Sequence, residues 1–204
     1  MLIIPSILTQ DPNEARELLK KAEEAGVKRV QIDVVDGKFA NNKTVDPVVF
    51  RNLETNILLD YHLMVDEPIN WVEKCLYAGA DRIIAQIEKM TNQFEFLAKV
   101  QSTGSLVGLA IDITTPVNAI EEEIIKNLDV VLVMSVPAGF GSQKFDFKAL
   151  DKIKKLNKIR KDDQSPFKIC VDGGITKELT FRLENAGADE ATVGGKRFFE
   201  QFMP

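Results

Sequence analysis

The stretch Ala78-Gly79-Ala80-Asp81-Arg82 has two close counterparts in the chain, and their spacing decides the predicted fold. Ala25-Gly26-Val27-Lys28-Arg29 comes before it, and Ala186-Gly187-Ala188-Asp189-Glu190 comes after it. The glycines lie 53 (79 − 26) and then 108 (187 − 79) residues apart, and each is well placed to end a helix in the left-handed conformation. These distances are near two and four repeats of a strand-plus-helix unit of about 25 residues.

Short runs rich in β-branched residues alternate with stretches of helical periodicity along the chain. Several runs are apolar almost throughout, as in Val130-Val131-Leu132-Val133, which is typical of strands covered by helices on both faces. In the helical stretch from Glu14 to Ala25, apolar residues share one face, and Asp11 with Pro12 provides a cap and first turn. The predicted strands are Leu2–Ile7, Arg29–Val34, Ile57–His62, Arg82–Ile87, Leu106–Asp112, Asp129–Met134, Phe167–Val171 and Glu190–Val193.

Eight strands and eight helices of this size fill 204 residues. A doubly wound open sheet usually has five or six strands and often a glycine-rich first turn, whereas the first turn here, Pro5-Ser6-Ile7-Leu8-Thr9, has no glycine. The sequence therefore predicts an α/β fold, a (β/α)8 TIM barrel, forming one domain over residues 1–204.

Composition narrows the classes of function. The formal net charge of −5 argues against a nucleic-acid partner bound through a general basic surface, and no apolar run is long enough for a membrane-spanning helix. Met1 to Leu8 lacks the pattern of a signal peptide. Cys75 and Cys170 are far apart and share no metal-type spacing, so we expect two buried thiols in a reducing, cytoplasmic compartment.

Two glycine pairs at predicted strand ends suit a phosphate group. Functional residues of parallel barrels lie at the C-terminal ends of the strands, often with phosphate after strands seven and eight. Asp172-Gly173-Gly174 and Gly194-Gly195-Lys196 occupy those places, and each is predicted to run into a helix whose N-terminus favours an anion. Lys196 adds a positive charge. Each pair alone could be only a tight turn, but both together in adjacent units indicate a sugar-phosphate site.

Two carboxylates and the single histidine complete the predicted site. Asp33 and Asp172 end strands that are well separated around a barrel, so they could remove a proton from one face of a carbon and return it to the other. Either could instead cap a loop or pair with a nearby cation. His62 ends the strand beside that of Asp33, where it could contact a ligand or be structural. Met64 and Met134 are expected to fill the barrel, and Ser135 and Glu88 to be structural.

With these residues in place, the chain resembles the ribulose-phosphate 3-epimerase family over almost its whole length. The resemblance is carried, in order, by Pro5-Ser6-Ile7-Leu8, Asp33-Val34-Val35-Asp36-Gly37 with Phe39, Asp60-Tyr61-His62-Leu63-Met64, Val133-Met134-Ser135-Val136, Gly139-Phe140-Gly141-Ser142-Gln143-Lys144-Phe145 and Val171-Asp172-Gly173-Gly174. No single piece is decisive, but together they form a specific signal.

The resemblance implies an isomerase that inverts C3 of a ketopentose 5-phosphate through an enediolate. Asp33 and Asp172 match the family's acid–base aspartates, which with two histidines hold a divalent metal such as zinc, iron or manganese; His62 matches one of these histidines. The matches to substrate-contacting positions are Ser6, Gly139, Phe140, Gly141, Ser142, Gly173, Gly174 and Gly195. The family also often forms homo-oligomers.

This chain departs from the family pattern where the metal would bind. Gln31 stands in place of a metal-ligating histidine and offers only a weak carbonyl ligand, Gln86 replaces a second histidine, and Lys196 replaces a serine. Losing metal stabilisation of an oxyanion would cost several kcal/mol, on the order of a thousandfold in rate. Two alternatives to the epimerase therefore stay open: a non-catalytic sugar-phosphate-binding barrel, and an isomerase or lyase acting on another phosphorylated sugar.

Overall fold

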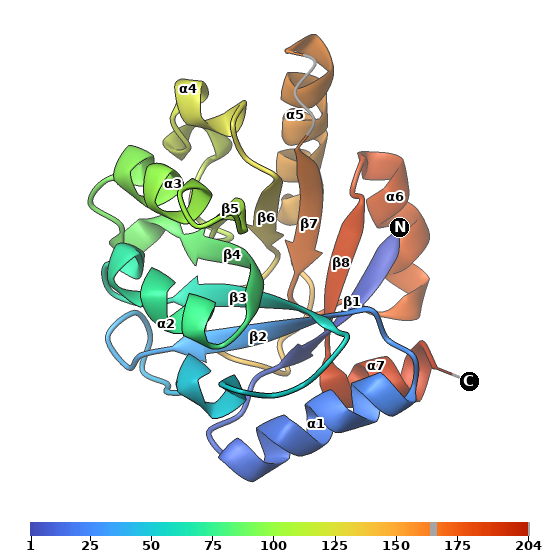
Figure 1. The fold of residues 1–204 in the computed structure, drawn as a ribbon. Helices are drawn as coiled ribbons and strands as arrows, with labels where there is room; N and C mark the ends of the chain where they lie inside the picture. Colours follow the sequence, from blue (N-terminus) through green and yellow to red (C-terminus); the bar gives the residue numbers. More distant parts are fainter. Residues whose placement is uncertain (164–166, 204) are drawn as a thin grey trace.

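Eight parallel strands form a closed barrel in the computed structural model, which describes residues 1–163 and 167–203 (Figure 1). Each strand pairs with the next along the chain, and β8 pairs with β1. The predicted (β/α)8 barrel is confirmed. The strands are β1 Leu2–Ile7, β2 Arg29–Val35, β3 Leu58–Met64, β4 Ala80–Gln86, β5 Leu106–Ile111, β6 Val130–Met134, β7 Lys168–Asp172 and β8 Glu190–Gly194.

All eight predicted strands are present, with ends that differ from the prediction by two residues or fewer. The largest differences are at β3, which continues two residues past His62, and at β4, which begins two residues before Arg82. Strand ends are the least certain feature of a sequence pattern, because the apolar run continues into the buried turn. The barrel places the ends that carry the predicted functional residues on one face.

The helices outside the barrel are shorter and more broken than predicted. Eight helices were expected, but the described residues contain seven α-helices, and only a 3-10 turn lies between β2 and β3. That connection is rich in turn formers such as Gly37, Asn41 and Asn42, which disfavour a helix. The α-helices are α1 Pro12–Glu24, α2 Val72–Tyr77, α3 Gln93–Gln101, α4 Glu122–Ile125, α5 Lys148–Asp162, α6 Thr180–Ala186 and α7 Gly195–Gln201. The 3-10 helices are η1 Pro47–Phe50, η2 Pro68–Trp71, η3 Ile87–Lys89, η4 Val117–Ala119 and η5 Lys177–Leu179.

The three related stretches that predicted the repeat share a structural role. Their glycines have positive φ angles, as expected for helix ends: 73° at Gly26, 77° at Gly79 and 110° at Gly187. In two of the stretches, the aspartate after the glycine also links neighbouring strands. Asp81 Oδ2 accepts a hydrogen bond from the backbone of Leu59 (2.9 Å), and Asp189 Oδ2 accepts one from Ile169 (2.7 Å). The repeat therefore reflects how each helix turns back into the sheet.

A buried ionic cluster fills part of the barrel interior towards the N-terminal ends of the strands. Arg82, which is 2% exposed, pairs with Asp60 and with Glu190, at 2.8 Å from the latter. Arg29 also pairs with Asp60. Removing one partner would leave an uncompensated buried charge, so this cluster is well suited to fix strand register. It uses Asp60 structurally, although that residue lies in one of the segments that carry the resemblance to the epimerase family.

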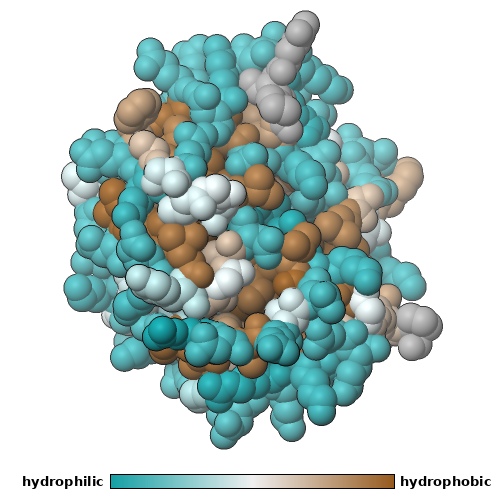
Figure 2. Space-filling model, viewed as in Figure 1, coloured by the Kyte–Doolittle hydropathy of each residue, from teal (hydrophilic) through white to brown (hydrophobic). Residues whose placement is uncertain are grey.

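The first and last elements of the chain lie together where the barrel closes. Helices α1 and α7 lie side by side beside β1 (Figure 1), and Lys21 Nζ of α1 lies 4.3 Å from the centre of the Phe199 ring of α7. Hydrophilic side chains dominate the rim of the face shown in Figure 2, and hydrophobic ones gather towards its middle. Within residues 1–163 and 167–203, no helix is both long and apolar enough to cross a bilayer.

Candidate active site

A pocket of about 380 Å³ opens at the C-terminal ends of the strands. Its walls come from the ends of β1, β2, β3, β6, β7 and β8 and from the loop after β6. Every residue predicted for the catalytic, substrate-binding or metal site lines it. These residues are Ser6, Asp33, His62, Gly139, Phe140, Gly141, Ser142, Asp172, Gly173, Gly174, Gly195 and Lys196.

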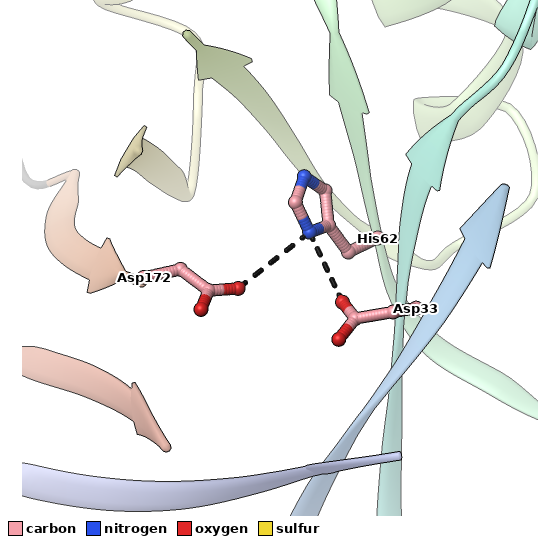
Figure 3. A group of neighbouring side chains, drawn as sticks. All are labelled: Asp33, His62 and Asp172. Atoms are coloured by element: carbon pink, nitrogen blue, oxygen red, sulfur yellow. Dashed lines mark hydrogen bonds and ion pairs between the residues drawn. The ribbon is translucent and has the colours of Figure 1, made fainter. Parts of the chain in front are cut away.

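The two predicted acid–base carboxylates approach the same nitrogen atom of the histidine. His62 Nδ1 lies 3.2 Å from Asp33 Oδ1 and 3.7 Å from Asp172 Oδ2, and Figure 3 shows the ring between the two carboxylates. The three side chains come from β3, β2 and β7 respectively. Hydrogen bonds from described side chains reach only Oδ1 of the Asp33 carboxylate, from Gln31 and His62. Its other oxygen accepts no hydrogen bond from the described side chains.

Gln31 lies two residues before Asp33 on β2, on the same face of the strand, and is fully buried. Its amide nitrogen donates to Asp33 Oδ1 at 2.8 Å and to Asp172 Oδ2 at 2.7 Å. Its amide oxygen accepts a hydrogen bond from the Thr192 hydroxyl at 3.0 Å. In this arrangement the amide oxygen of Gln31 faces away from the carboxylates, so it is not presented to them as the carbonyl ligand that the sequence suggested.

The ligand atoms of Asp33, His62 and Asp172 lie within 4.8 Å of one another, which is close enough to share a metal ion. Gln31 is the residue that does not fit such an ion. Its Nε2 carries two protons and no free lone pair, and it lies between the two carboxylates where the ion would bind. The residues present therefore match the predicted metal position but not its chemistry.

The electrostatics of the pocket act strongly on Asp172. Burial first, and then the nearby negative charge of Asp33, raise the pKa of Asp172 from 3.8 to about 7. Hydrogen bonding from Gln31 and the proximity of His62 oppose this rise in pKa. A carboxyl group with a pKa near 7 can act as either acid or base at neutral pH.

The other edge of the His62 ring contacts Gln86. The amide nitrogen of Gln86 lies 3.1 Å from His62 Nε2, and an amide NH2 can only donate. His62 Nε2 therefore faces a donor, while Nδ1 on the other side of the ring faces Asp33. The Gln86 Oε1 atom is buried without a hydrogen-bond partner among the described residues.

Glycine loops form the opposite end of the pocket. Gly195 begins α7, as predicted, but Gly173-Gly174 does not run directly into a helix, because Ile175 and Thr176 precede η5. The Ser135 hydroxyl donates to the carbonyl of Gly173 and so helps to fix this turn. Exposed Lys196 lines the same end of the pocket. This end offers backbone N–H groups and a cation, which suit an anion.

The loop after β6 is held over the pocket by side-chain amides. Asn42 Nδ2 donates to the carbonyl of Gly139 at 2.7 Å, and Gln143 Nε2 donates to that of Phe140 at 3.0 Å. Ser142 in this loop has a φ of 60°, a conformation that is uncommon for residues other than glycine. These contacts fix a loop that carries four of the predicted binding residues.

The sequence did not indicate several of the residues that line the site. Thr192 lines the pocket and binds Gln31, but it lies in an apolar strand without a motif. It lies two residues before Gly194 on the inward face of β8, and that alternation was the available signal. Met64 and Met134 are buried, as expected of barrel filling, yet both also line the pocket. Glu88 does not line the pocket, and it accepts a hydrogen bond from the backbone nitrogen of Asp112 at 2.7 Å.

A closed parallel barrel whose strand ends gather carboxylates beside glycine loops suited to an anion has the arrangement of a TIM-barrel enzyme. The chain belongs to the ribulose-phosphate 3-epimerase family, whose model matches residues 2–199. The prediction of an isomerase is confirmed at the level of this family.

Curated relatives agree with the family model. The chain is 33% identical over 195 residues to a ribulose-phosphate 3-epimerase of Bacillus subtilis, covering 94% of this chain and 89% of the relative. It is 36% identical over 208 residues to one of Chlamydia muridarum, covering 98% and 89%. Among solved structures, a 3-hexulose-6-phosphate synthase superposes with a TM-score of 0.66 at 16% identity, covering 96% of this chain and 90% of that one. That similarity supports the barrel fold alone.

Proposed function

We propose that this protein epimerises C3 of a ketopentose 5-phosphate, ribulose 5-phosphate being the first candidate. The observation that carries the proposal is that Asp33 and Asp172, from β2 and β7, line one pocket and both hydrogen-bond to the same amide. Two carboxylates that reach one carbon from different strands are what inversion by proton transfer requires.

In the proposed reaction, one ionised carboxylate takes the proton from C3, and the bonding electrons move into the C2 carbonyl to give an enediolate. The other aspartate, which is protonated, then gives its proton to the opposite face of C3 as the enediolate collapses to the ketone. The pair carries one proton before and after the reaction and two while the enediolate exists, and the remaining proton has changed sides after each turnover. Proton exchange with solvent returns the two aspartates to their starting protonation states, so no further reactant is needed.

The substrate lies with its phosphate at the glycine loops in this proposal. Backbone N–H groups of Gly173, Gly174 and Gly195 and the ammonium of Lys196 bind the phosphate. Ser6 and the loop Gly139–Ser142 contact the sugar. No step of the proposed reaction passes through a metal, since Gln31 does not fit one.

The experiment that tests this proposal follows the C3 proton of the substrate by NMR in deuterated water. The purified protein should exchange the C3 proton of ribulose 5-phosphate with solvent and form its C3 epimer. Ligand-induced thermal stabilisation without exchange or turnover would favour the non-catalytic barrel. Exchange on another sugar phosphate, but not on ribulose 5-phosphate, would favour the other isomerase or lyase. A homo-oligomer and a cytoplasmic location stay predictions.

A further inference from the structure

The amide of Gln31 lies among the three side chains that could bind a metal. Its Nε2 atom is 2.8 Å from Asp33 Oδ1, 2.7 Å from Asp172 Oδ2 and 3.4 Å from His62 Nδ1. The same side chains form the group with metal-ligand spacing. One neutral side-chain nitrogen therefore contacts every residue that would contact the ion.

The orientation of this amide is fixed by its neighbours. An ionised carboxylate only accepts hydrogen bonds, and the pair holds at least one, so the NH2 group faces Asp33 and Asp172. The Thr192 hydroxyl, itself 3.5 Å from Cys170 Sγ, donates to the amide oxygen at 3.0 Å. Turning the amide over would place three acceptors together in a buried site, and Asp33 Oδ1 and Asp172 Oδ2 would both lose their donor. Such a loss of buried hydrogen bonds costs about 1–3 kcal/mol for each group.

A divalent ion cannot share this position with the Gln31 nitrogen. Zinc binds carboxylate oxygen and histidine nitrogen at about 2.0–2.2 Å, so an ion held by Asp33, His62 and Asp172 would lie among their ligand atoms. The Gln31 NH2 group is already in contact with those atoms and has no lone pair to offer. Binding the ion would require the buried Gln31 side chain to leave both carboxylates and Thr192.

We infer that Gln31 takes the place of the metal in this chain, so that the protein works without a divalent cation and Gln31 acts as a positioning residue. It holds Asp33 and Asp172 at a fixed separation, one N–H group to each. The inference rests on the proposed epimerase function for its catalytic part, whereas its metal-binding part is independent of any activity.

Metal binding is measured first, on the wild-type chain. After dialysis against a chelator, the protein should contain far less than one equivalent of zinc, iron or manganese by elemental analysis. Adding Zn²⁺ or Mn²⁺ should leave its thermal midpoint unchanged, because a ligand that does not bind the native state cannot stabilise it. Its rate of C3 exchange should be the same with and without the chelator.

Two histidine variants then test whether residue 31 lies at the metal position. Gln31→His places a ring nitrogen with a lone pair beside the three candidate ligands and should gain about one equivalent of Zn²⁺ with a rise of several degrees in thermal midpoint. Gln86→His is the matched control, since Gln86 contacts the opposite edge of the His62 ring and should gain no metal. Equal gains in both variants would overturn the assignment of the metal position.

The positioning role is tested with Gln31→Leu, which keeps the approximate size but removes the amide. Its kcat should fall about a hundredfold, while KM changes less than about threefold, because the phosphate contacts are untouched. A fall in kcat and a rise in KM of similar size would indicate general disruption and contradict the positioning role. If this variant does not fold, the wild-type metal measurements still decide the inference.

The outcomes separate this inference from the proposed function. Wild-type activity that is lost on chelation and restored by Zn²⁺ or Mn²⁺ overturns the inference and leaves the epimerase standing. A well-folded wild type that exchanges no C3 proton overturns the epimerase, but its metal content and thermal midpoint still decide whether Gln31 excludes the ion.

Discussion

Gln31 on β2 donates a hydrogen bond to Asp172 on β7, with 2.7 Å between Nε2 and Oδ2. The bond crosses the barrel interior and joins residues 141 positions apart in the sequence. Because the donor is neutral, it holds the Asp172 carboxyl in place without the strong stabilisation of its anion that a dication would provide. Burial therefore keeps the pKa of Asp172 high, at about 7.

This pKa predicts how the rate depends on pH. The proposed reaction needs one proton on the Asp33–Asp172 pair, and that proton is lost as the pH rises through about 7. We expect kcat/KM to fall about tenfold per pH unit above that value in both directions of the reaction, since both directions use the singly protonated pair. The measurement is a pH–rate profile at constant ionic strength. A flat profile from about pH 7 to 9 would contradict the shared-proton mechanism.

The same ionisation should lower the stability of the folded chain. The folded pKa of Asp172 lies above its unfolded value of 3.8, so the unfolded state loses this proton first. Stability therefore falls as the pH rises from about 4 to 7 and stays lower above that range. Asp172→Asn removes the cost of burying an ionised carboxylate and should raise the thermal midpoint by a few degrees at about pH 8. At about pH 4, where wild-type Asp172 is protonated in the folded state, the gain should shrink; an equal gain at both pH values would indicate another cause.

Single substitutions of the two aspartates should have opposite selectivity. In Asp172→Asn, Asp33 can still remove and return a proton on its own face of C3, so one epimer should exchange its C3 proton with solvent without inverting. Asp33→Asn should show such exchange only with the other epimer. Epimerisation itself should fall about a thousandfold in each variant. Deuterium wash-in measured separately on the two epimers checks this, and loss of exchange with the same epimer in both variants would argue for a single base.

The sequence predicted the barrel well because its signals are local and repeated. Each strand is an apolar run of the right length, and each Ala-Gly stretch marks a helix end. The position of the site followed from one rule, that functional residues of a barrel lie at the C-terminal strand ends. The missing helix between β2 and β3 was not predicted, because counting units says nothing about how a connection rich in turn formers is built.

The direction in which Gln31 points could not be read from the sequence. Glutamine offers both an acceptor and a donor, and the choice depends on Thr192 and Asp172, which lie far away in the chain. The sequence pattern indicates that Gln31 is a weak metal ligand. In the structure, its NH2 group instead donates hydrogen bonds to Asp33 and Asp172, which are two of the predicted metal ligands. Thr192 was missed for the same reason, since its role appears only once β8 closes against β1 and faces β2 across the interior.

Lys196 should contribute to affinity for the phosphate and little to the chemical step. It is exposed at the glycine end of the pocket, where one charge–phosphate contact supplies roughly a tenfold gain in binding. Lys196→Ala should therefore raise KM about tenfold with kcat nearly unchanged, and added salt should reduce the difference from wild type. Lys177→Ala, which removes an exposed lysine outside this pocket, is the matched control. A fall in kcat without a change in KM would place Lys196 near the reacting carbon instead.

Gly174 and Gly194 lie at the same end of the pocket but should differ sharply in their tolerance of a side chain. Gly174 has a φ of 59°, and a Cβ there would lie 2.3 Å from the backbone nitrogen of Phe145 and 2.8 Å from the carbonyl carbon of Lys144. Backbone atoms cannot move aside as a flexible side chain can, and the positive φ adds strain of about 1–2 kcal/mol. A Cβ at Gly194 would meet no atom within 4 Å, and the φ there is −50°.

We therefore expect Gly174→Ala to lower the free energy of unfolding by about 3 kcal/mol, and Gly194→Ala by less than about 1 kcal/mol. Equilibrium unfolding in urea, followed by circular dichroism, measures both values, and the slope with denaturant shows whether the comparison is two-state. Gly174→Ala should also raise KM for the sugar phosphate, because relief of the clash moves the turn whose N–H groups face the phosphate. Equal stability of the two variants would show that the loop after β6 can withdraw from Gly174, and the turn would then be an adaptable part of the pocket rather than a fixed one.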